Sequence, residues 1–78
     1  MFKKYSKIAK LFKIQKRLIA RREELIKLEN SVNYLITVSC GEEEQRFKDQ
    51  LRKLKDDQFL YTMAIIDTKI EIDALIAS

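Results

Sequence analysis

The chain has 78 residues, of which 36% are charged and 46% hydrophobic, with one glycine, one cysteine and neither proline nor histidine. The lone cysteine excludes an internal disulfide, and the absence of histidine excludes Cys–His zinc sites. A chain this short buries only about 60% of its unfolded surface, so we expect a partner to supplement its core. The composition suits long helices better than a disordered tail or a many-stranded sheet.

The same composition argues against chemistry. Histidine, the commonest general base, is missing, and one glycine cannot build a phosphate-binding loop. The sequence therefore predicts no enzyme, cofactor, metal site or small-molecule substrate. The single Cys40 favours a reducing, cytoplasmic location. The chain has no run of about 18 apolar residues, so we expect no membrane span. Abundant Lys and Ile without Pro, Trp or His would fit an AT-rich genome, such as that of a phage or virus.

The first predicted element is a helix over about residues 2–38. Its apolar residues recur at alternating three- and four-residue steps, with Arg21 as one polar interruption, which predicts a coiled-coil seam. The seam consists of Leu11, Ile14, Leu18, Leu25, Leu28, Val32 and Leu35. Residues 32–38 are also rich in strand-forming types, so a mixed helix–strand fold is the alternative.

The start of this helix is strongly basic, because residues 1–22 carry nine Lys or Arg and no acid. One interpretation is pairing across a hairpin with Asp67, Glu71 and Asp73. Others are docking to an acidic, apolar groove of a protein, nucleic-acid binding, and, as the least favoured, an anionic membrane surface. The basic side of the helix comprises Lys3, Lys7, Lys10, Lys13, Arg17 and Arg21.

A turn is predicted at residues 39–41. Gly41 tolerates positive φ, Ser39 and Glu42 have capping-box spacing, and the acidic residues 42–44 suit a helix N-terminus. Because the turn is short, the second helix, over about 42–77, must fold back antiparallel to the first.

The second helix carries a matching seam, which Gln58 and Thr68 interrupt. Position 21 is expected opposite position 58, so either an Arg21–Gln58 contact fixes the register of the hairpin or Arg21 extends into solvent. The apolar seam residues are Phe47, Leu51, Leu54, Tyr61, Ile65, Ile72 and Leu75.

Each helix has one more apolar stripe than a single hairpin can bury. The first helix adds Tyr5, Ile8, Phe12, Ile19 and Ile26, and the second adds Phe59, Met63, Ile66 and Ile70. We therefore expect an all-α, single-domain antiparallel two-helix coiled-coil hairpin over 1–78 that forms a homodimeric four-helix bundle. Its expected function is protein–protein interaction through these stripes, as a small adaptor, chaperone-like or inhibitory protein that binds itself or a larger protein. The alternative is nucleic-acid binding through residues 3–22.

Overall fold

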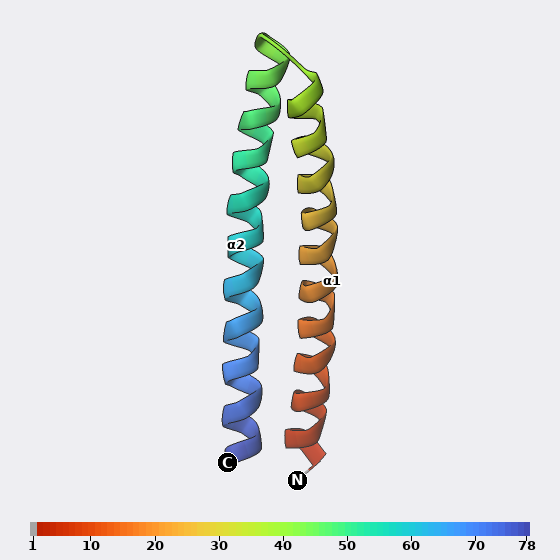
Figure 1. The fold of residues 1–78 in the computed structure, drawn as a ribbon. Coiled ribbons are helices and arrows are strands. Elements are labelled where there is room, and N and C mark those ends of the chain that lie inside the picture. The colour runs from red at the N-terminus through yellow and green to blue at the C-terminus, as the bar shows by residue number, and fades with distance from the viewer. Residues whose placement is uncertain (1) are drawn as a thin grey trace.

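The computed structural model describes residues 2–78 as two long helices that pack side by side (Figure 1). Helix α1 spans Phe2–Val38 and helix α2 spans Glu42–Ala77. The turn between them lies at one end and both chain ends lie at the other, over a length of 61 Å. The predicted helical hairpin is confirmed. Residues 32–38 are helical, so the mixed helix–strand alternative is wrong.

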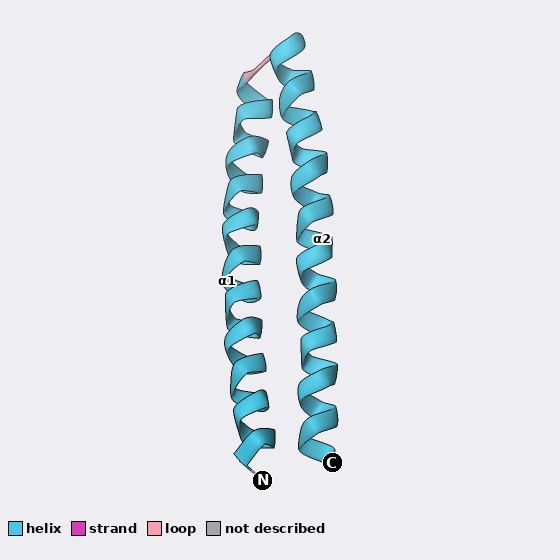
Figure 2. Cartoon of the chain, turned by 180° about the vertical axis from the view of Figure 1, so that it is seen from behind, coloured by secondary structure: helices cyan, strands magenta, loops and turns pink. Residues whose placement is uncertain are grey.

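Nothing within either helix interrupts the backbone, because the chain lacks proline and its one glycine lies in the turn. Thirty-six residues at 1.5 Å per residue give about 54 Å of helix, which accounts for most of the observed length. Figure 2 shows from behind that the connection is a single tight loop. Helices of this length in water gain most of their stability from packing, so the interface between α1 and α2 determines the fold.

Gly41 makes the turn possible. Its φ of 66° and ψ of −132° lie in a region that residues with a Cβ atom rarely enter. Gly41 is also the N-cap of α2, and no side chain caps the helix there; the Gln45 N–H donates to the Gly41 carbonyl at 3.3 Å. The predicted capping box of Ser39 and Glu42 is therefore wrong, because the residue that reverses the chain must also start the helix. Three glutamates in the first turn of α2 offset the positive end of its dipole.

The seam of α2 lies where the heptad pattern places it. All seven predicted apolar seam residues are buried or half-buried, and so are the two polar interruptions, Gln58 and Thr68. Thr68 is buried, and its hydroxyl donates to the Ala64 carbonyl of the same helix at 2.7 Å. The hydroxyl is thus satisfied without help from α1.

The seam of α1 differs from the prediction in half of its positions. Leu11, Leu25 and Val32 are buried as expected, but Ile14, Leu28 and Leu35 are 46%, 49% and 37% exposed. Their places are taken by the residues four positions after Leu11, Leu18, Leu25 and Val32. The observed seam is Ile8, Leu11, Gln15, Leu18, Arg22, Leu25, Glu29, Val32 and Ile36. At 100° per residue, α1 is turned by about 50° from the predicted orientation.

The core between the helices is thin. Four apolar side chains, Leu11, Leu25, Val32 and Ile72, are buried, and among residues 3–78 no side chain is fully enclosed. Two helices in contact along one line leave most of each helix surface in water. Neither α1 nor α2 contains an apolar stretch that would let it cross a lipid bilayer.

Candidate protein-binding surface

The hairpin has a larger accessible surface than a globular monomer of the same mass. A globular monomer of 9.3 kDa has an accessible surface of about 5,000 Å², whereas this chain exposes 6323 Å². The difference, about 1,300 Å², follows from the elongated shape and from apolar side chains that face solvent.

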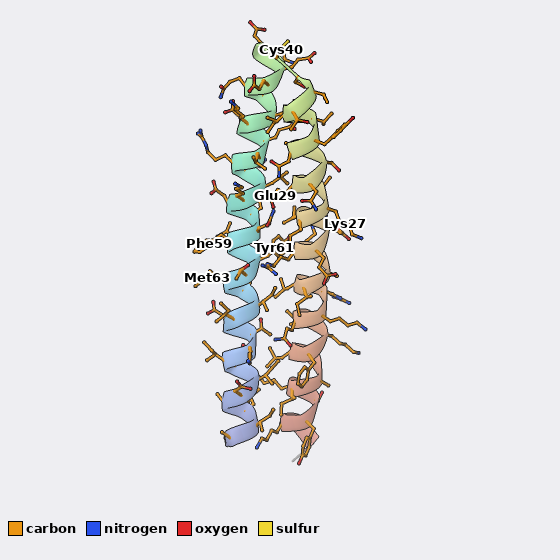
Figure 3. The ribbon with its side chains drawn as sticks, viewed as in Figure 1. Lys27, Glu29, Cys40, Phe59, Tyr61 and Met63 are labelled. Atoms are coloured by element: carbon orange, nitrogen blue, oxygen red, sulfur yellow. The ribbon has the colours of Figure 1, made fainter. Side chains whose placement is uncertain are left out.

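The apolar residues of α2 outside its seam form an outer stripe, which consists of Phe59, Met63, Ile66 and Ile70. All four are exposed. Figure 3 shows Phe59 and Met63 pointing away from α1, whereas Tyr61 lies toward it. The spacing of four, three and four residues places the stripe opposite the seam, so the hairpin itself cannot cover it.

The corresponding residues of α1 divide into two groups. Tyr5, Phe12 and Ile19 are exposed on one flank of the α1 seam. Ile8 and Ile26 are half-buried, and Ile8 belongs to the seam itself. The structure therefore leaves seven of the nine predicted docking residues open to solvent, three on α1 and four on α2.

Five of these seven residues share one broad side of the hairpin. Along each seam, two seam residues three positions apart are followed directly by a residue on the flank of the helix. In two antiparallel helices, these flank residues lie on the same side of the pair. This rule places Tyr5, Phe12 and Ile19 of α1 beside Ile76 of α2, which is also exposed. Phe59 and Ile66 are the next residues around α2. We call these six the flank face; it covers the half of the hairpin near the chain ends.

Ile76 and Leu60 are exposed apolar residues that the stripe pattern did not include. The sequence could have identified Ile76, because it directly follows the seam residue Leu75. Phe12 follows the seam residue Leu11 in the same way, so both lie on the same flank. Leu60 lies beside the outer stripe.

The opposite side of the hairpin has a shallow groove nearer the turn. Its floor is apolar, with Leu25, Leu28 and Val32 from α1 and Leu54 from α2. Its remaining lining is charged or polar: Arg21, Gln50, Lys53 and Asp57. The groove explains the exposure of Leu28, which lines it instead of filling the seam.

Four polar residues join the helices near the middle of the hairpin. Arg22 Nε donates to Thr62 Oγ1 at 2.8 Å, and Gln58 Nε2 donates to Glu29 Oε2 at 2.9 Å. Thr62 Oγ1 in turn donates to the Gln58 carbonyl at 2.9 Å. We call Arg22, Glu29, Gln58 and Thr62 the polar clasp. It accounts for the turned orientation of α1, because in that orientation two polar residues of α1 meet partners on α2.

The predicted Arg21–Gln58 contact is wrong. Gln58 pairs with Glu29, eight residues further along α1, and Arg21 extends toward solvent, as the second alternative held. Arg21 Nη1 donates to Glu24 Oε2 at 2.7 Å within α1. This bond, aided by the nearby Tyr61 hydroxyl, raises the pKa of Arg21 above its ordinary value. The guanidinium therefore stays charged.

Most basic residues at the start of α1 are exposed, and among the described residues none of them forms an ion pair with α2. Within residues 2–78, the two ion pairs are Arg21–Glu24 and Lys48–Glu44, each inside one helix. In this part of the chain, no ion pair joins the first turns of α1 to the acids at 67, 71 and 73. The six predicted nucleic-acid-binding residues, Lys3, Lys7, Lys10, Lys13, Arg17 and Arg21, are all exposed.

Groups that support chemistry are sparse over the described residues. No three Cys, Asp or Glu side chains gather where they would hold a metal ion. Cys40 is exposed in the turn as a free thiol. Comparison with known proteins finds no match for this chain among family models, curated proteins or solved structures. The proposals below therefore depend on the geometry of the hairpin alone.

Proposed function

We propose that this chain is a non-enzymatic protein–protein interaction module that docks through its flank face and outer stripe. The supporting observation is the concentration of exposed apolar side chains there, among them three aromatic residues, Tyr5, Phe12 and Phe59. Aromatic residues are enriched at protein interfaces, where they contribute much of the binding energy. Large exposed apolar patches on small proteins commonly mark such interfaces.

Self-association into a four-helix bundle is part of this proposal. A stable interface of standard size removes about 800 Å² from each partner. The excess surface of the hairpin, about 1,300 Å², is large enough to supply that area. A second hairpin would also give each helix two neighbours, which the wide apolar surface of α1 requires.

Sedimentation equilibrium at micromolar concentration tests the proposal. We expect a dimer for the wild-type chain and a monomer for Phe59→Asp. The matched control is Tyr34→Asp, because Tyr34 is also exposed (67%, against 64% for Phe59) but lies on α1 outside both proposed docking regions. Circular dichroism should show equal helix content for the two variants. A wild-type chain that is monomeric and captures no protein from cell extract would refute the proposed function.

Nucleic-acid binding is a second candidate, which the unpaired basic residues of α1 support. A protein that neutralises phosphates loses affinity steeply as salt rises. We expect a gel-shift titration at two salt concentrations to show this loss, and Lys10→Glu with Arg17→Glu to weaken binding. Lys27→Glu is the control, because Lys27 lies outside the basic segment and points away from α2 (Figure 3). Absence of binding at low salt would exclude this candidate.

A further inference from the structure

We infer that the occupant of the flank face is a second copy of this chain, oriented with both turns at the same end of the bundle. In this dimer, α1 of each copy packs beside α2 of the other. The inference rests on the proposed function and specifies its partner and geometry. Three observations carry it: the area available, the position of the flank face along the hairpin, and the charge of each helix.

The area is sufficient for another hairpin as the partner. The surplus of about 1,300 Å² exceeds the roughly 800 Å² that each partner contributes to a standard interface. A twofold dimer uses the same surface on both copies, so one self-complementary apolar face is sufficient. The flank face fits this requirement because both helices contribute to it, with three residues each.

The position of the flank face limits how two copies align. Its residues lie between positions 5 and 19 of α1 and between 59 and 76 of α2. Phe59 lies at the middle of α2, and the other five lie in the half near the chain ends. On the same side nearer the turn, the corresponding positions hold the half-buried Ile26 and three exposed polar residues, Asn33, Lys48 and Lys55. In the half near the chain ends, one exposed charged residue, Lys69, lies at a corresponding position on α2. A full-length overlap with the turns at opposite ends would lay the apolar half of one copy on this polar half of the other.

With both turns at the same end, the two apolar halves meet at the same height. The Arg22–Thr62 bond sets the register of each hairpin, so the part of α1 before residue 22 lies level with the part of α2 after residue 62. Ile19 of one copy would then lie at the height of Ile66 on α2 of the other copy, and Ile76 would lie between the heights of Tyr5 and Phe12.

The charges of the helices favour the same arrangement. Helix α1 carries ten Lys or Arg and three Asp or Glu, a net +7, whereas α2 carries six and nine, a net −3. In a face-to-face dimer with both turns at one end, the twofold axis runs along the bundle and places each α1 beside the partner's α2. With turns at opposite ends, the axis runs across the bundle and places α1 on α1, where like charges repel.

The single cysteine allows a direct test. Cys40 is exposed in the turn, so a spin label on the natural thiol reports the distance between the two turns of a dimer. Neighbouring helices in a bundle lie about 10 Å apart, so we expect a double electron–electron resonance distance below about 30 Å. Turns at opposite ends of a fully overlapped dimer would lie about 60 Å apart, since the hairpin is 61 Å long.

Each outcome separates the inference from the proposed function. A short distance that Phe59→Asp abolishes and Tyr34→Asp preserves supports the inference. A dimer with a long distance overturns the arrangement but leaves self-association intact. A short distance that survives Phe59→Asp shows that another face is used and also overturns the inference. A labelled chain that sediments as a monomer at the concentration of the measurement overturns the second-copy occupant, and capture of another protein would then preserve the broader function.

Discussion

The polar clasp yields a quantitative prediction about why α1 adopts its orientation. We consider Glu29→Ala, Gln58→Ala and the double variant. The Gln58 Nε2–Glu29 Oε2 hydrogen bond is 2.9 Å long and joins two half-buried side chains, one of them charged. Buried hydrogen bonds to charged groups contribute about 1.5–3 kcal/mol, and exposed ion pairs about 0–1 kcal/mol. For a half-buried bond we expect a coupling energy of about 1 kcal/mol, a roughly fivefold change in the folding equilibrium.

The assay is urea denaturation of all four proteins, followed by circular dichroism at one common protein concentration, since dimer formation makes apparent stability concentration-dependent. The control cycle pairs Gln58→Ala with Glu23→Ala, because Glu23 is exposed and, within the described residues, forms no hydrogen bond or ion pair with α2. The free-energy effects of substitutions at distant sites add to within about 0.3–0.5 kcal/mol. A Glu29–Gln58 coupling no larger than that of the control would refute the idea that the clasp sets the orientation of α1.

Four further substitutions test the seam and the turn by the same assay. Leu25→Ala should cost about 2–4 kcal/mol because Leu25 is 4% exposed, whereas Leu28→Ala should cost about 1 kcal/mol or less; equal losses would restore the originally predicted seam. Gly41→Ala should destabilise by about 1–3 kcal/mol through backbone strain alone, since no atom lies within 4 Å of the added Cβ; an unchanged midpoint would show that the turn relaxes. Thr68→Val should be neutral or stabilising by up to about 1 kcal/mol, because its hydroxyl bonds only a carbonyl of its own helix, and a clear loss would assign that hydroxyl a role in pairing.

The heptad pattern was enough to predict the hairpin and the seam of α2. In α2 the apolar residues at seam spacing outnumber the polar ones, so only one orientation buries them well. In α1, two orientations share Leu11, Leu18, Leu25 and Val32, and the pattern alone favoured the one with more apolar residues. The structure has the other orientation, because Arg22 and Glu29 reach partners 40 and 29 positions away in the sequence. A pattern confined to one helix does not contain those partners.

The docking residues were predictable to a similar extent. A hairpin buries one apolar stripe per helix, and α2 has two. This comparison identified the exposed residues of α2 without knowledge of the register. On α1 the same count placed Ile8 with the surplus and Leu28 in the seam, and the structure reverses both. The orientation of α1 decides which flank is free, and that orientation depends on the polar clasp.

The placement of both chain ends at one end of the hairpin has a mechanical consequence. Tension applied between residues near 2 and 78 would pull the helices apart sideways, starting with the seam residues nearest the chain ends, Ile8 and Leu75, and loading one layer of the seam at a time. Tension applied between residue 78 and Cys40, at the opposite end, would instead load α2 along its axis. The same chain should therefore open at low force when it is peeled from its ends, and α2 should resist much higher force when it is stretched along its length.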